Sequence, residues 1–181
     1  DLLEESLASF LEKNSRCDAA IAQNETQAET FWRIRESISE AERATGPALQ
    51  FDISVPVDAM PDFMVDAARA AEQAFEGTTA TSFGHLGDGN VHFHVRSPAG
   101  ITDGSAWIAG QGKNITRFIH DTVVNAGGSI SAEHGIGQMK RAELGRLSSP
   151  ARLHALRAVK TALDPFDIMN PGKLIPLASE G

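Results

Sequence analysis

The chain contains little cysteine, few basic residues and no long apolar run, and each shortage excludes a class of protein. Its single cysteine, Cys17, permits no disulfide within the chain. That is typical of a reducing compartment, so we expect a cytoplasmic location. Sixteen basic against 24 acidic residues give a net charge of −8, and such a surface repels nucleic-acid backbones. The apolar runs are far shorter than the roughly 20 residues of a membrane-spanning helix, so neither nucleic-acid binding nor a membrane span is expected.

The 181 residues are 41% hydrophobic, which is enough apolar material for the core of one domain. Periodicity and helix-capping signals predict helices over 1–14, 25–44, 59–76, 104–126 and 150–163. Strands are expected over 17–23, 49–56, 78–97 (two strands around the GHLGDGN turn) and at the start of 129–137, followed by an ordered tail over 164–176. This order favours a single α+β domain over 1–181, a ferredoxin-like antiparallel sheet with helices packed on one face.

The histidines are clustered. His85, His92 and His94 fall within ten residues, and a second glycine-rich loop carries Glu133 and His134. Strand alternation points His92 and His94 to the same face, and the GDGN turn brings His85 back near His92. Two imidazoles and a carboxylate are a common ligand set for zinc or another divalent metal. The alternative is that each histidine is only a solvated strand residue.

Other polar residues each have a functional and a structural interpretation. Arg35 lies beside the apolar face of the second predicted helix, where it could bind a substrate carboxylate or pair with Glu36. Lys140, after the second glycine-rich loop, could neutralise an anion or belong to a solvated basic pair. His120 and His154 lie on predicted helices and are interpreted as surface residues or as satisfied core residues. Cys17 is interpreted as a small buried apolar residue rather than a nucleophile.

Three motifs together, GHLGDGNVHFHV, SAEHGIGQMKR and LDPFDIMNPGKLIP, resemble the C-terminal domain of FAD-linked oxidases. These are the D-lactate, glycolate and D-2-hydroxyglutarate dehydrogenases of the vanillyl-alcohol-oxidase type. The upstream segments WRIRESISEAER and FDISVP are similar to the same family in the same order. The resemblance therefore runs from about residue 25 to residue 177.

The resemblance implies a cap domain. In such enzymes an N-terminal domain holds most of the FAD, and the C-terminal domain covers the flavin and shapes the substrate pocket. We therefore expect residues 1–181 to be the C-terminal fragment of a longer dehydrogenase, inactive without its own N-terminal FAD domain. The surface that faces the flavin domain would be exposed in the fragment, so self-association into a homodimer is a further expectation.

The resemblance also implies roles for individual residues. The ligands of the metal-dependent members correspond to His85, His92 and Glu133. His134 corresponds to the active-site histidine, which contacts the substrate hydroxyl or acts as its base beside the cofactor. Arg35 corresponds to the arginine that grips the substrate carboxylate, and Asn170 to a residue near the flavin ring. The implied reaction is the FAD-dependent oxidation of a D-2-hydroxy acid to a 2-oxo acid, with a divalent metal activating the hydroxyl.

Two residues depart from the pattern of the 2-hydroxyglutarate enzymes. Gln50 stands where close members carry lysine, and His94 stands where they tend to carry asparagine. His94 could be a fourth metal ligand or a substrate contact. The substrate is therefore open between D-2-hydroxyglutarate, D-lactate and other small 2-hydroxy acids, and the electron acceptor is open. A stand-alone metal-dependent hydrolase and a non-catalytic binding module are the alternative functions.

Overall fold

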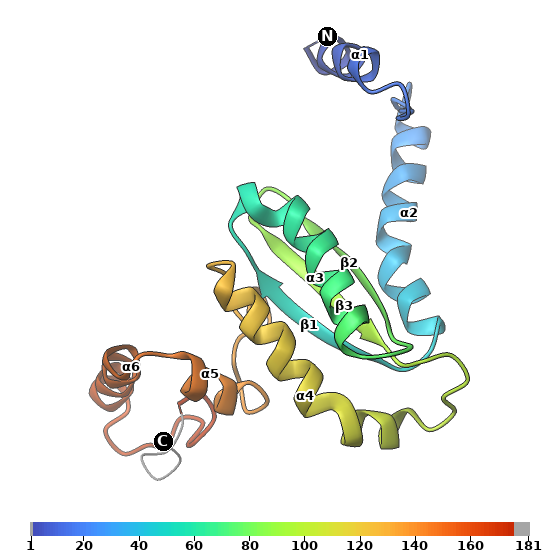
Figure 1. The fold of residues 1–181 in the computed structure, drawn as a ribbon. Helices are drawn as coiled ribbons and strands as arrows, with labels where there is room; N and C mark the ends of the chain where they lie inside the picture. Colours follow the sequence, from blue (N-terminus) through green and yellow to red (C-terminus); the bar gives the residue numbers. More distant parts are fainter. Residues whose placement is uncertain (1, 176–181) are drawn as a thin grey trace. The chain divides into compact units, whose positions relative to one another are not determined.

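The computed structural model describes residues 2–175, and the chain divides into two compact units, Asp1–Thr45 and Gly46–Gly181. The first unit contains α1 (Leu2–Lys13) and α2 (Glu25–Ala44), close to the predicted bounds (Figure 1). The side chain of Asn24 accepts the backbone N–H of Gln27 and so caps the start of α2. The predicted strand over 17–23 is wrong, because these residues form only bends and irregular structure. Cys17 is exposed rather than buried.

The second unit is built on a three-stranded antiparallel sheet with the strand order β1-β3-β2. The strands are β1 (Ala48–Ser54), β2 (Thr79–His85) and β3 (Asn90–Arg96). A short 3₁₀ turn, η1 (Val57–Ala59), leads into α3 (Met60–Ala74), and β3 is followed by α4 (Gly104–Asn125). Figure 1 shows α3 and α4 side by side over one face of the sheet. Two further helices, α5 (Arg141–Leu147) and α6 (Pro150–Leu163), complete this unit.

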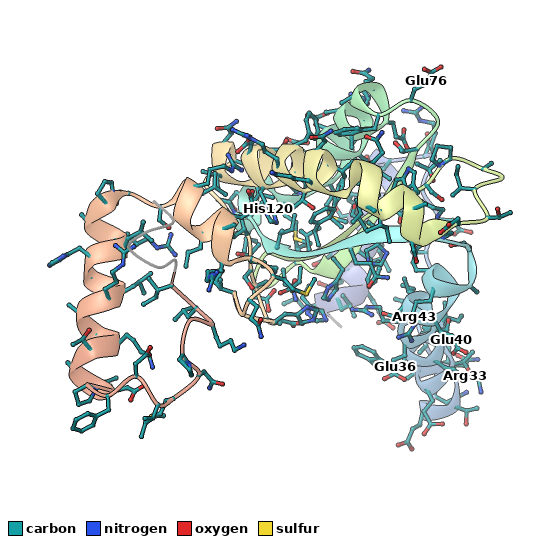
Figure 2. The ribbon with its side chains drawn as sticks, turned by 90° about the horizontal axis from the view of Figure 1, so that it is seen from below. Arg33, Glu36, Glu40, Arg43, Glu76 and His120 are labelled. Atoms are coloured by element: carbon teal, nitrogen blue, oxygen red, sulfur yellow. The ribbon has the colours of Figure 1, made fainter. Side chains whose placement is uncertain are left out.

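Strand alternation separates an apolar face of the sheet from a polar one. Phe51, Ile53, Val91, Phe93 and Val95 face the helices and are at most 5% exposed. The helices complete this core with Met60, Phe63, Ala67, Ala71, Ile115, Ile119 and Val123. His120 also points from α4 toward the sheet, and its ring lies edge-on to Phe51 at 5.8 Å (Figure 2). The intervening strand residues therefore lie on the opposite, polar face.

The α+β class is confirmed, but the ferredoxin-like topology is not. That topology needs a fourth strand, and the predicted strand at the start of 129–137 is wrong. Within the described residues, only Ser129 pairs with Ser54 there, as an isolated antiparallel bridge. The strand does not continue because the backbone N–H groups of residues 132–134 donate to the side chain of Asp52 instead of to a neighbouring strand.

The described C-terminal part, up to residue 175, consists of α6 followed by turns and irregular structure. The Ser149 side chain caps α6 by accepting the N–H of Arg152. After α6, the buried Asp164 pairs with Lys160 and accepts the N–H groups of Ile168 and Met169. Pro176, the last residue of the predicted tail, lies outside the described residues. None of the helices within residues 2–175 is both long and apolar enough to span a membrane.

The turn between β2 and β3 depends on glycine. Gly89 has a φ of +72°, and a Cβ there would lie 2.0 Å from the carbonyl oxygen of Val55. The Gly89 carbonyl in turn accepts the N–H of Val55 at 3.0 Å. This close approach fixes the turn against the end of β1, and the turn carries His85 on one side and leads to His92 on the other.

We expect Gly89→Ala to lower the free energy of unfolding by about 2–3 kcal/mol, through left-handed backbone strain and the clash with Val55. Urea unfolding measures the change. Gly87→Ala in the same turn is the matched control, because a Cβ at Gly87 meets no atom within 4 Å. Equal destabilisation by the two substitutions would contradict this account of the turn.

Candidate functional site

The candidate site is built on the polar face of the sheet. The strand register places Asp52, His92 and Phe83 opposite one another across β1, β3 and β2. The neighbouring row brings together Ser54, Asn90 and His85. His85 and His92 therefore come from adjacent rows on the same face, as the predicted hairpin requires, and their ring centroids lie 6.4 Å apart.

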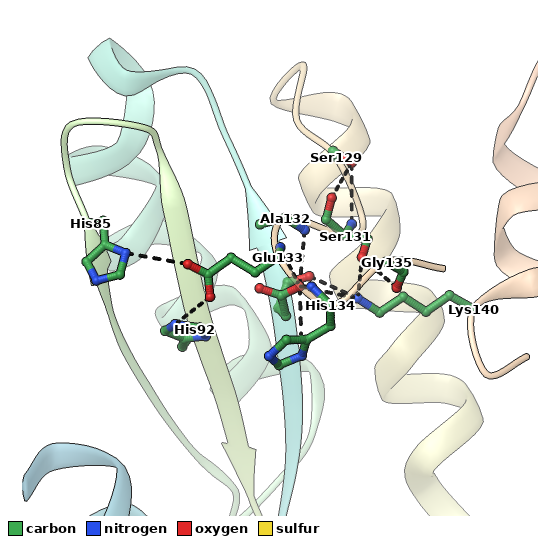
Figure 3. Close-up of polar contacts among 10 residues, drawn as sticks. His85, His92, Ser129, Ser131, Ala132, Glu133, His134, Gly135 and Lys140 are labelled. Carbon is green, nitrogen blue, oxygen red and sulfur yellow. Dashed lines mark hydrogen bonds and ion pairs between the residues drawn. The ribbon is translucent and has the colours of Figure 1, made fainter. Parts of the chain in front are cut away.

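Glu133 reaches this face from the loop after α4. Its Oε1 lies 3.7 Å from His85 Nδ1, and its Oε2 lies 3.9 Å from His92 Nε2 (Figure 3). Each carboxylate oxygen thus faces a different imidazole. His94 is buried one row further along β3, with its ring 5.4 Å from that of Phe83. The structure therefore brings together the three residues that were predicted as metal ligands.

Asp52 holds the loop that carries Glu133 in place. Its side chain is 3% exposed, and its Oδ2 accepts the backbone N–H groups of Ala132, Glu133 and His134 at 3.2, 3.0 and 2.8 Å. Three bonds to one ionised oxygen fix the direction of three consecutive peptide groups. The sequence patterns do not single out Asp52. The available signal was an acid between the core residues Phe51 and Ile53, on the same strand face as the histidines.

Lys140 neutralises the carboxylate of Asp52, which is a group of the protein itself. Its Nζ donates to the backbone carbonyl of Asp52 at 3.0 Å and to Ser131 Oγ at 3.2 Å. It also lies 3.9 Å from Asp52 Oδ2. We refer to residues 131–140, which are held at both ends by these contacts, as the site loop. Of the two interpretations of Lys140, the structure supports charge neutralisation.

The electrostatics of the site favour an ionised Asp52 and a neutral His92. Burial raises the pKa of Asp52, but the N–H groups of His134 and Glu133 and the nearby cations outweigh it and lower the pKa below the ordinary value. Burial lowers the pKa of His92, although Glu133 and Asp52 oppose the shift. The pKa of Lys140 is also lowered by burial, and Asp52 offsets part of that effect. A neutral His92 keeps the lone pair that a metal ligand needs.

His134 lies at the edge of the cluster. Its Nδ1 is 3.8 Å from Asp52 Oδ2, its ring centroid is 6.3 Å from that of His92, and its side chain is 68% exposed. Asn170 is exposed in the tail after α6, where its carbonyl accepts the N–H of Lys173. Arg35 is partly buried on α2, in the first unit. The structure thus gathers four of the six predicted residues, and the roles of Arg35 and Asn170 stay predictions.

His85 and His92 each lie near enough to Glu133 to share a divalent metal with it, but ligand atoms of all three residues do not lie within 4.8 Å of one another. Two ligands bound to one tetrahedral zinc at about 2.1 Å lie roughly 3.4 Å apart. The separations of 3.7 and 3.9 Å are longer than hydrogen bonds and close to that value. Among the described residues, the group whose ligand atoms all lie within 4.8 Å of one another consists of Asp52, Glu133 and His134. In that group, Asp52 Oδ2 already accepts three N–H groups and lies near the cationic Lys140, whereas the buried Oδ1 has no hydrogen-bond partner among the described residues.

Comparisons with known proteins agree with the motifs. Residues 2–174 match the family described as FAD linked oxidases, C-terminal domain. The D-2-hydroxyglutarate dehydrogenase of Stutzerimonas stutzeri (strain A1501) is 35% identical over 174 residues, which cover 94% of this chain and 37% of the relative. The mitochondrial D-2-hydroxyglutarate dehydrogenase of Arabidopsis thaliana is 37% identical over 175 residues, 96% of this chain and 29% of the relative. The chain therefore spans about a third of the length of these relatives.

We expect Asp52→Asn to lower the free energy of unfolding by about 2 kcal/mol at pH 7, because the amide offers the site loop a weaker acceptor. The folded-state pKa of Asp52 is depressed, so its contribution is complete above the ordinary value of 3.8 and is lost as the pH falls through the lower folded value. The difference from the unmodified chain should therefore shrink in acid. Urea unfolding at several pH values tests this, with the exposed Asp58→Asn as control. An equal, pH-independent loss in both variants would rule it out.

Proposed function

The chain belongs to the family of FAD-linked oxidase C-terminal domains, and on this premise we propose that it forms the substrate and metal side of an FAD-dependent dehydrogenase for D-2-hydroxy acids. The product would be the corresponding 2-oxo acid. The observation that carries the proposal is the convergence of His85, His92 and Glu133 from three separate elements onto one face of the sheet. Relatives named D-2-hydroxyglutarate dehydrogenase make that dicarboxylic acid the first candidate substrate. Gln50 keeps D-lactate and similar monocarboxylic acids as the next candidates.

His85, His92 and Glu133 would hold a divalent metal such as zinc. When bound, such a cation would polarise the substrate hydroxyl and make its proton easier to remove. Burial keeps His92 neutral, and the Asp52 bonds to the site loop hold Glu133 against both imidazoles. These contacts would hold Glu133 near both histidines, so that a bound cation would need only a small further approach of the three side chains.

His134 would accept the hydroxyl proton. The carboxylate of Asp52 faces Nδ1 and favours the tautomer that carries a proton there, which leaves the Nε2 lone pair for the substrate. The exposure of the His134 ring gives a substrate access to that nitrogen. When bound, FAD supplies the hydride acceptor. The hydroxyl proton would thus pass to His134, and the hydride of the neighbouring carbon would pass to the flavin.

The remaining parts of the proposal concern groups outside this cluster. Arg35 would pair with the substrate carboxylate through its planar guanidinium, and Asn170 would lie near the flavin ring. The rest of the FAD site would come from an N-terminal domain of the same polypeptide, which is also the proposed partner of this chain. Cytoplasmic location and homodimer formation stay predictions that no contact in the structure addresses.

We expect the chain to bind Zn²⁺, and His92→Ala to weaken that binding on the order of 100-fold by removing one of three protein ligands. Isothermal titration calorimetry against a competing chelator measures both affinities. His154→Ala, an exposed histidine on α6, is the matched control and should bind zinc like the unmodified chain. Zinc binding that is equally strong in His92→Ala would refute the proposed ligand set.

In the intact dehydrogenase, we expect His134→Ala to reduce kcat about 10²- to 10⁴-fold, the usual contribution of a general base. Turnover of D-2-hydroxyglutarate and D-lactate with a dye acceptor measures the loss. Metal analysis should find an unchanged zinc content, because His134 is not one of the three ligands. Turnover within a few fold of the unmodified enzyme would show that the base is another group. Hydrolytic activity without flavin, together with no reduction of the dye, would instead favour a metal-dependent hydrolase.

A further inference from the structure

His120 is a buried histidine that the proposed reaction does not use. Its side chain is 2% exposed on α4, and its Nδ1 lies 3.0 Å from Oε2 of Glu143 on α5. Burial lowers the pKa of His120, although Glu143 opposes the shift, so the ring is neutral near pH 7. The pKa of Glu143 is lowered mainly by its bonds from Arg146, so its carboxylate is ionised and can only accept. His120 must therefore donate from Nδ1.

Four side chains link α4 to α5, and we refer to them as the α4–α5 cluster: His120, Asp121, Glu143 and Arg146. Arg146 donates to Glu143 through Nε and Nη2 at 3.0 and 2.7 Å. Its Nη1 donates to Asp121 Oδ1 at 2.6 Å. Each helix contributes two members, and each member on α5 contacts one on α4. The cluster thus forms a continuous chain of hydrogen bonds between the two helices.

The position of α5 depends on such contacts. The helix has only seven residues, has no side-chain cap at its start and buries only Leu144 among its described residues. Two helical turns are unstable in isolation, so tertiary contacts must hold them. α5 starts directly after Lys140, whose carbonyl accepts the N–H of Leu144 at 2.8 Å. Lys140 is the residue that joins the end of the site loop to Asp52 and Ser131.

We propose that His120 is a positioning residue for the candidate site: through the α4–α5 cluster and Lys140 it fixes the C-terminal end of the site loop, while Asp52 fixes the part that carries Glu133. His120 touches neither the metal ligands nor a substrate position, so it acts through the loop. The ring of His120 also packs against Phe51, the neighbour of Asp52 on β1. The two supports of the loop therefore share one strand. The consequence for metal affinity rests on the proposed function, whereas the consequence for the loop does not.

Hydrogen exchange of the full chain tests the proposal. In His120→Phe, which keeps an aromatic ring but loses the donor to Glu143, the amides of Lys140 and Arg141, which donate to Ile136 and Gln138 at the C-terminal end of the site loop, should exchange about tenfold faster. His120→Asn places an N–H near the position of Nδ1 and should restore slow exchange. Ile115→Val, a core substitution on the same helix away from α5, is the control for general destabilisation. Unchanged exchange in His120→Phe, or equal acceleration in Ile115→Val, overturns the proposal.

Two further measurements distinguish a failure of the positioning role of His120 from a failure of the proposed metal site. Arg146→Gln disrupts the cluster from its more exposed side and should accelerate the same amides even if His120→Phe folds poorly. Zn²⁺ affinity, measured by calorimetry, should fall about tenfold in Arg146→Gln, as is usual when a residue that supports ligands is lost. If the unmodified chain binds no zinc, the proposed function fails while the exchange result still decides the role of His120. If the amides in Arg146→Gln exchange as in the unmodified chain, the positioning role fails while the metal site stands.

Discussion

The candidate site depends on one buried carboxylate. Asp52 accepts three consecutive backbone N–H groups with a single oxygen, and Lys140 lies beside it to balance the charge. A buried ionised group is costly unless hydrogen bonds and an opposite charge compensate for its lost hydration. Here the compensation comes from the segment whose position matters for function. The interactions that make Asp52 tolerable in the interior are thus the same ones that hold Glu133 against the two histidines.

This interaction also explains why the sheet ends where it does. A chain that passes the free edge of β1 would normally continue as a fourth strand, and Ser129 makes the first such pair with Ser54. Beyond that residue, the N–H groups that a strand would use turn toward the side chain of Asp52. In place of further hydrogen bonds between strands, the fold has a rigid loop from which the side chains of Glu133 and His134 project. A loop supported by a sheet is a common place for binding and catalytic residues.

The sequence predicted correctly those parts of the fold that depend on a local pattern of residues. Helices α2 and α6 have the predicted bounds, and period-two alternation placed His92 and the core residue Phe93 on opposite faces. The approach of His85 to His92 also followed from the hairpin, whereas Glu133 was placed beside them only by the metal-ligand hypothesis. Asp52 could not be assigned its role, because its partners lie about 80 residues away and are backbone groups. Helix α5 is too short for a periodic pattern, and its contacts with α4 are long-range.

Strand β1 contributes residues to both the core and the candidate site. Phe51 and Ile53 pack under α3 and α4, while Asp52 between them organises the opposite face. Any shift or twist of this strand that repacks the interior also moves the carboxylate on the other side. The stability of the domain can therefore be adapted to heat or cold more easily by substitutions on the sides of α3 and α4 that face the sheet. Such substitutions leave strand β1 itself in place.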